Sequence, residues 1–248
     1  MNMVVRSIDE VVAQHPDFKT KVGWERREDG GLENPKYGVV KTGVVCKPDG
    51  APIYAQWFYD EANMMSTERG PAVTGAVTVP YFIKPKDGLV YLAMVKQGRP
   101  AVIDGKTGER GEMVSTELPR GFANKGENGV ETALREGGEE TRKNLQDVKY
   151  IGVSVANTTF FGAGVQIYSA RFDPAIEGSL KPDAKEQILK MDYVALPDLL
   201  MALRETPENI YCGFTKGALM DFIASLPPEV MLKQMIAFYE LEMKKDKK

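Results

Sequence analysis

Short runs in which hydrophobic and polar residues alternate predict two β-hairpins in the first part of the chain. Residues 37–46 and 53–59 flank the turn-forming sequence PDG. Residues 75–83 and 89–95 flank a second turn sequence, KPKDG. Two such runs around a short turn that contains glycine are typical of a hairpin. Further strands are predicted at residues 113–118, 150–156, 165–172 and 188–195.

Hydrophobic residues recur with helical spacing in the segments between and after these strands. A helix is predicted after residue 126, and we expect one of its sides to pack on a sheet. That side carries Val130, Leu134, Thr141 and Leu145, with Gly137 and Gly138 beside them. Other helices are predicted at residues 7–14, 197–204, 215–224 and 229–245.

The order of these elements predicts an α/β protein with two segments, whose approximate boundary lies near residue 70. Residues 1–70 form a β-rich segment with a possible role in dimerisation, and residues 71–248 form the main α/β body with a C-terminal helical extension. Strands that alternate with helices favour a sheet covered by helices.

Composition narrows the function classes. The chain is 43% hydrophobic and 27% charged, as in soluble globular proteins, and its net charge of -3 disfavours nucleic acid as a partner. His15 is the only histidine, which disfavours sites that depend on histidine. Two cysteines, no leader and no long apolar run predict a cytoplasmic protein without a membrane partner.

Three glutamates in the predicted central helix indicate a metal site. Glu136, Glu139 and Glu140 have the spacing that brings side chains together within one helical turn. Like charges repel at that spacing, and a hard divalent cation such as Mg²⁺ reverses the sign of the interaction. The alternative is an ordinary solvated helix, in which Arg135 pairs with Glu131 and Glu139.

The larger spacing around these glutamates decides between the two interpretations. Residues 121–140 resemble the Nudix box, G-x5-E-x7-R-E-U-x-E-E-x-G-U, where U is a bulky aliphatic residue. The positions that match are Gly121, Glu127, Arg135, Glu136, Glu139 and Glu140. The resemblance implies an α/β/α sandwich around a mixed sheet, with the box forming a loop, a helix and a loop.

The resemblance also implies roles for these residues. Glu136, Glu139 and Glu140 would bind Mg²⁺ or Mn²⁺, and the backbone carbonyl of Arg120 would be a further ligand. Glu127 and Arg135 would support the metal ligands, and Gly121 would let the chain turn tightly into the site.

The end of the box departs from the family pattern. Gly137 stands where a bulky aliphatic residue is usual, Arg142 replaces the glycine, and Lys143 replaces the last aliphatic residue. Two adjacent glycines cost a helix roughly 1 kcal/mol each relative to alanine, so a close contact between the helix and the sheet is expected to compensate.

Sequences outside the box resemble those of ADP-ribose and nucleotide-sugar pyrophosphatases. The run from Glu117 to Gly121 is similar to their E-x-P-x-G lead-in, and residues 95–100 are similar to their V-x-Q-x-R-P run. By this resemblance Glu117 and Arg99 would contact substrate, and the N-terminal β segment would pair with a second subunit in a homodimer.

Two further roles depend on loops. In the similar enzymes a glutamate after the box activates water, and Glu186 is the candidate here, with Glu177 and Asp183 as alternatives. The loop at residues 157–164 contains Phe160 and Phe161, either of which can stack on a base or pack in the core.

Together these features predict hydrolysis of the pyrophosphate bond of ADP-ribose or a related nucleoside-diphosphate sugar. The products would be a nucleoside monophosphate and a sugar phosphate. The alternatives are a Nudix hydrolase of a nucleoside triphosphate, a dinucleotide or a coenzyme A derivative, and a Nudix-like domain that binds a nucleotide without cutting it.

Overall fold

The computed structural model describes the backbone of residues 13–14, 25–26, 32–34, 38–46, 52–59, 73–98, 114–157, 161–181, 188–210 and 212–245. Of the helix predicted at residues 7–14, only residues 13–14 belong to this set, and they are helical. Arg99, Phe160, Asp183 and Glu186 lie outside it.

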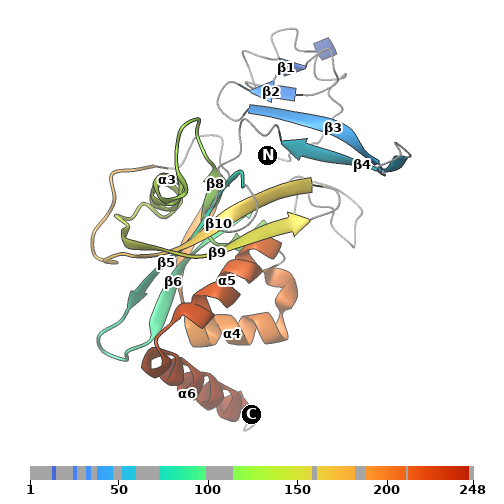
Figure 1. Cartoon of the computed structure of the whole chain (residues 1–248). Coiled ribbons are helices and arrows are strands. Elements are labelled where there is room, and N and C mark those ends of the chain that lie inside the picture. Colours follow the sequence, from blue (N-terminus) through green and yellow to red (C-terminus); the bar gives the residue numbers. More distant parts are fainter. Residues whose placement is uncertain are drawn as a thin grey trace.

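A single mixed sheet forms the centre of the molecule (Figure 1). Its main path runs in the order β1-β2-β3-β4-β10-β5-β6-β11, while β7 pairs with β6, β8 with β5 and β9 with β10. Strand β10 is parallel to β4 and β5, and the other pairings are antiparallel. The strands are β1 (Glu25–Arg26), β2 (Leu32–Asn34), β3 (Gly38–Cys46), β4 (Pro52–Tyr59), β5 (Gly75–Ile83), β6 (Val90–Gly98), β7 (Val114–Glu117), β8 (Arg120–Phe122), β9 (Gln146–Asn157), β10 (Phe161–Arg171) and β11 (Ile188–Ala195).

Helices cover both faces of this sheet, so the predicted α/β/α sandwich with a mixed sheet is confirmed (Figure 1). Helix α3 (Gly129–Thr141) packs on one face, and α4 (Leu196–Glu205) and α5 (Gly213–Ser225) pack on the other. A short 3-10 helix, η2 (Pro207–Asn209), and the terminal helix α6 (Pro228–Lys245) complete the body. None of the described helices is both long and apolar enough to span a bilayer.

The alternation of side chains along β5 separates two cores. Val77 and Val79 point into the larger core, between the sheet and α4 and α5, whereas Ala76 and Thr78 face α3. Large, fully buried side chains of the larger core include Leu92, Met94, Leu118, Ile167, Leu196, Leu219 and Phe222. The α3 side instead has small residues, which allow a close approach.

Both predicted hairpins are confirmed, as β3–β4 and β5–β6. The prediction was wrong at two places near the box. Strand β8 was not predicted, because three residues are too few to show alternation. The loop predicted at residues 157–164 is shorter, since β9 continues to Asn157 and β10 begins at Phe161.

Helix α6 is attached to the β5–β6 turn by one polar side chain. Gln234 is fully buried; its Oε1 accepts a hydrogen bond from the Val90 amide at 3.0 Å, and its Nε2 donates to the Gly88 carbonyl at 3.4 Å. Other side chains of α6 leave an exposed apolar stripe. The stripe consists of Leu232, Ile236, Tyr239 and Met243.

The face of α3 that packs on the sheet matches the expected one only in part. Gly137, Gly138 and Thr141 are buried as expected, whereas Val130 is 41% exposed and Ala133, which was not expected there, lies against β5. The Thr78 hydroxyl donates to the Ala133 carbonyl at 2.8 Å, a contact that only a closely packed helix can make. Small residues therefore decide this interface, and the larger apolar ones that define the helical wheel do not.

Gly137 explains why the usual aliphatic residue is missing from the box. A Cβ atom at this position would lie 2.6 Å from Leu145 Cδ1 and 3.1 Å from Thr78 Cβ and Cγ2. The expected close contact between this glycine and the sheet is confirmed, and its packing compensates for the low helix propensity.

We expect Gly137→Ala to destabilise the protein and the neighbouring Gly138→Ala not to. A Cβ at Gly138 would meet Leu180 Cδ1, the tip of a half-exposed side chain that can move, so this variant should gain about 1 kcal/mol of helix propensity. Gly137→Ala should lose about 1–3 kcal/mol through overpacking. Urea unfolding measures both, and equal stabilisation by the two alanines would contradict this packing.

Candidate functional site

Strand β8 and the start of α3 form the frame of the site. Ala76 pairs with Gly121 in the register of β5 and β8. Asn128 is the N-cap residue directly before α3. Its side chain accepts a hydrogen bond from the Glu131 amide at 3.0 Å, and the Glu131 carboxylate accepts one from the Asn128 amide at 2.9 Å. This capping box satisfies two amides and fixes where the helix starts. The glutamates that follow therefore have defined positions next to β8.

Arg135 is the centre of a network of ion pairs. Its Nε and Nη2 donate to the two oxygens of Glu127 at 2.7 and 2.8 Å. Its Nη1 lies 2.6 Å from Glu136 Oε1 and 3.4 Å from Glu139 Oε2. Nη2 also donates to the Phe122 carbonyl at 2.8 Å. A planar guanidinium can make all these contacts at once, so a single side chain links β8, the following loop and two glutamates of the box.

Glu127 is held from two further directions. It accepts hydrogen bonds from the Asn124 amide and side-chain nitrogen, both at 2.8 Å, and from the Thr132 hydroxyl at 3.3 Å. The hydrogen bonds from Arg135 lower the pKa of Glu127 to about 2, against the opposing effect of burial. Burial alone would lower the pKa of Arg135, but Glu127 and Glu136 raise it above its usual value. Both groups are therefore charged near neutral pH.

Gly121 makes room for the Glu136 carboxylate. A Cβ atom on Gly121 would lie 2.1 Å from Glu136 Cδ, closer than any side-chain atom can come. The tight turn expected at Gly121 is wrong, because this residue lies within β8. The box needs glycine here for space beside the carboxylate.

Glu140 contacts strand β6 of the sheet. It is 3% exposed, and its Oε1 accepts a hydrogen bond from Gln97 Nε2 at 3.0 Å. Gln97 lies on β6 and was not predicted as a site residue, although it is the glutamine of the V-x-Q-x-R-P run. Asn124 was also missed, since a loop asparagine gives no signal at the level of sequence.

The carboxylates of α3 are chemically suited to a hard divalent cation, which prefers oxygen ligands. Glu136 and Glu140 are buried, and the Glu139 side chain is 22% exposed. Arg135 contacts Glu136 and Glu139 directly. Within the described part of the chain, no three acidic, histidine or cysteine side chains gather closely enough to hold a metal ion. The oxygen donors are thus of the type that a metal ion prefers, and Arg135 pairs with two of these glutamates.

Glu117 and Arg120 pair with each other beside the box. Glu117 is 1% exposed, and its Oε2 lies 3.3 Å from Arg120 Nε. The Arg120 guanidinium also lies 5.6 Å from the centre of the Phe214 ring. The Arg120 side chain thus packs against α5, and its backbone belongs to β8. Glu117 is enclosed by this packing, while its expected contact with substrate stays a prediction.

Four other residues were predicted for the site: Arg99, Phe161, Glu177 and Glu186. Phe161 begins β10, where its backbone is paired with Trp57 and Asn157. Arg99 and Glu186 lie outside the described residues. Glu177, the alternative to Glu186, pairs with Lys143 at 2.6 Å.

The departures at the end of the box have defined structural roles. Arg142 ends α3 with φ 55° and ψ 37°, the left-handed conformation that glycine adopts most easily. Lys143 is 3% exposed, and its Nζ donates to Glu177 Oε1 at 2.6 Å and to the Pro174 carbonyl at 3.1 Å. The buried lysine ties the end of the helix to the segment after β10, where the family uses an aliphatic residue.

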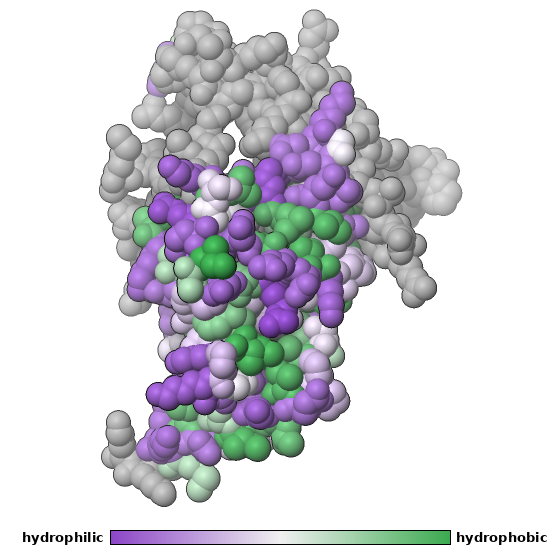
Figure 2. All heavy atoms as spheres, turned by 90° about the vertical axis from the view of Figure 1, so that its left-hand side faces the viewer, coloured by the Kyte–Doolittle hydropathy of each residue, from purple (hydrophilic) through white to green (hydrophobic). Residues whose placement is uncertain are grey.

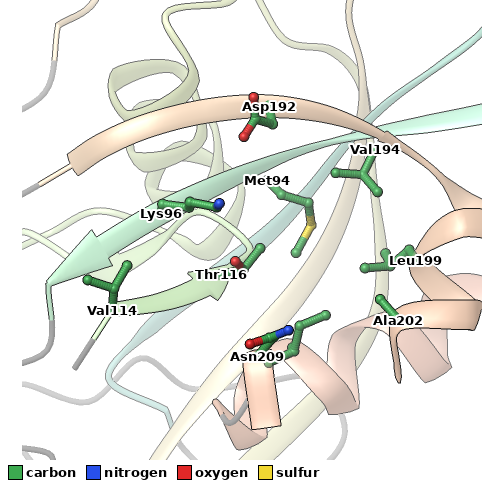
Figure 3. Close-up of a pocket in the computed structure, with 10 residues that line it drawn as sticks. Met94, Lys96, Val114, Thr116, Asp192, Val194, Leu199, Ala202 and Asn209 are labelled. Carbon is green, nitrogen blue, oxygen red and sulfur yellow. The ribbon is translucent and has the colours of Figure 1, made fainter. Parts of the chain in front are cut away.

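Two pockets adjoin the sheet on opposite faces. One, of about 550 Å³, lies at the end of α3 and is lined in part by Glu140 and Arg142. The other, of about 400 Å³, lies between β6, β7 and β11 on one side and α4 and η2 on the other (Figure 3). Figure 3 shows Met94 near the middle of the view, with Lys96 and Asp192 on the strands and Leu199 and Ala202 on α4. Only the first pocket includes a residue of the box.

Comparisons with known proteins agree with this geometry. The model of the NUDIX domain matches residues 76–214. No curated protein matches the chain. A solved structure described as an ADP compounds hydrolase is similar, with a TM-score of 0.50 and 19% sequence identity over 74% of this chain and 83% of that chain, which shows a shared fold. Because the NUDIX match spans more than half of the chain and contains the whole Arg135 network, the chain belongs to the Nudix family of pyrophosphohydrolases.

Proposed function

We propose that the protein hydrolyses the pyrophosphate bond of ADP-ribose or a related nucleoside-diphosphate sugar in a reaction that depends on Mg²⁺ or Mn²⁺. The products are a nucleoside monophosphate and a sugar phosphate. The observation that carries this proposal is the acidic face of α3, where Glu136 and Glu140 are buried and a charged Arg135 lies beside Glu136 and Glu139.

Each part of the site has a task in this reaction. Glu136, Glu139 and Glu140, with the Arg120 carbonyl, would hold the metal, which when bound neutralises phosphate charge and lowers the pKa of water. Glu127 holds Arg135 so that the guanidinium orients Glu136 and Glu139. Gln97 orients Glu140 from the neighbouring strand. Glu186 is our candidate for the residue that activates water.

The choice of an ADP-ribose-like substrate depends on residues next to the box. The run from Glu117 to Gly121 and the one that contains Arg99 resemble those of ADP-ribose pyrophosphatases. Arg99 would bind a phosphate or the neighbouring ribose, and Phe161 would stack on a ring. The similar solved structure is described as a hydrolase of ADP compounds, which is compatible with this choice.

A substrate panel tests the proposal. With Mg²⁺ present, we expect release of nucleoside monophosphate from ADP-ribose to exceed release from a nucleoside triphosphate, a dinucleotide and a coenzyme A derivative. The double variant Glu139→Gln/Glu140→Gln should lose nearly all turnover, because neutral amides bind a hard cation poorly. Glu131→Gln is the control on the same helix, since glutamine preserves the capping box while one negative charge is removed.

The outcomes separate the alternatives. If a nucleoside triphosphate is turned over best and ADP-ribose is not turned over, the choice of substrate is overturned. Metal-dependent hydrolysis of a phosphoanhydride would still be supported. Turnover retained in the double variant would overturn the metal assignment. Binding of ADP-ribose with no turnover of any compound by the unaltered protein would favour a Nudix-like domain that binds a nucleotide without cutting it.

We also propose that the chain forms a homodimer, with the N-terminal β segment at residues 1–70 as the first candidate interface. In the described backbone β4 meets β10 at one register pair, Trp57 with Phe161, so the hairpin of β3 and β4 shares little described backbone pairing with the rest of the sheet. The exposed apolar stripe of α6 is the second candidate.

Sedimentation equilibrium tests the oligomeric state. We expect a mass of twice the 27.5 kDa of one chain at micromolar concentration. Ile236→Glu places a charge in the middle of the α6 stripe, so it should leave the dimer intact if the N-terminal segment forms the interface, and should separate the subunits if α6 does. A mass of 27.5 kDa at all concentrations would refute the dimer.

A further inference from the structure

The pocket at the end of α3 is unusual in its charges. It has a volume of about 550 Å³ and is bordered by the end of α3, the segment after β10 and the start of β11. Glu140 forms part of one wall, and Arg142, Lys181 and Lys190 supply three cations. It opens beside a glutamate of the box, where the proposed chemistry requires the substrate to bind. Figure 2 faces this side of the molecule and shows many hydrophilic residues interspersed with hydrophobic ones.

Two of these cations have no charged partner in the described part of the chain. The third cation, Lys190, pairs with Asp192 at 2.6 Å. Besides Glu140, the pocket is lined by one more carboxylate, that of Glu177, which pairs with Lys143 at 2.6 Å. By contrast, the described residues provide no ion pair for the side chains of Arg142 and Lys181. Among the described residues, the pocket thus carries two positive charges without an ion-pair partner, on Arg142 and Lys181, beside the Glu140 carboxylate, which favours a polyvalent anion as its ligand.

The backbone of Arg142 supports the same interpretation independently. Its φ of 55° is strained for any residue with a Cβ atom, and the Nudix box has glycine at this position. The carbonyl of Arg142 accepts a hydrogen bond from the Gly178 amide at 2.7 Å, and the adjacent Lys143 is paired with Glu177, so the segment after β10 holds this conformation through two contacts. A strained arginine in place of a glycine, beside a pocket that Lys181 and Lys190 also line, indicates a functional reason for the side chain.

We propose that Arg142 and Lys181 form a phosphate-binding subsite that holds the diphosphate of the substrate beside Glu140. The identity of the substrate in this inference rests on the proposed function. The binding of phosphate rests on the residues that line the pocket. A guanidinium that presents several donors in one plane suits phosphate oxygens, and an ammonium adds a second charge on the opposite side.

Arg142→Gly is the decisive variant because it separates strain from binding. We expect it to raise the midpoint of thermal unfolding by roughly 2 to 4 °C, since the left-handed conformation no longer carries a Cβ atom. We also expect it to weaken the binding of inorganic pyrophosphate roughly tenfold, measured by calorimetry on the whole protein in EDTA. Lys181→Gln should weaken pyrophosphate binding by a similar factor and leave the midpoint unchanged.

The chain offers a matched control for the strain. Asp147 is the other described non-glycine residue with positive φ, at 50°, and it is not among the residues that line the pocket. Its ion pair with Arg171 spans 3.8 Å between two exposed side chains and contributes little. Asp147→Gly should therefore raise the midpoint in the same way as Arg142→Gly and leave pyrophosphate binding unchanged.

The results distinguish this subsite from the proposed function. Unchanged pyrophosphate affinity in both Arg142→Gly and Lys181→Gln would overturn the subsite, even if the protein hydrolyses ADP-ribose. Weaker pyrophosphate binding in both variants would support the subsite, even if no nucleoside-diphosphate sugar is a substrate.

Discussion

The two hydrogen bonds between the Arg135 guanidinium and the Glu127 carboxylate are the interaction on which the site depends. They fix a cation in the middle of an acidic face, where it also contacts Glu136 and Glu139. Without this cation the glutamates of one helical turn would repel one another, and without Glu127 the cation would itself compete for the glutamates. The geometry of the proposed metal ligands is thus set by a residue that is not one of them.

The second constraint is close packing around this network. Glycine at position 121 leaves space for the Glu136 carboxylate, and glycine at position 137 lets α3 approach β5. Both contacts reduce the exposure of the carboxylates to water, and Glu140 is reached by Gln97 from the sheet. Burial strengthens the hydrogen bonds that orient these groups, and it makes their desolvation costly until a cation balances the charge.

The sequence allowed a good prediction of the hairpins, the helices and the spacing of the box, because each depends on local periodicity. It did not reveal the whole packing face of α3, since Val130 counts as hydrophobic on a wheel but is exposed, and the contact of Ala133 with β5 was not expected. The contact between Gln97 and Glu140 was also out of reach, because it depends on how strand and helix meet.

Binding of Mn²⁺ to the Glu127→Gln variant tests the central claim most directly, because Glu127 lies outside the proposed metal ligands. Titration followed by electron paramagnetic resonance should show an affinity lower by about 10- to 100-fold than that of the unaltered chain, as expected when a supporting residue is lost. Glu131→Gln, with the same change of charge in the first turn of α3, should bind Mn²⁺ normally. Equal Mn²⁺ affinity of the Glu127→Gln variant and the unaltered chain would contradict the account.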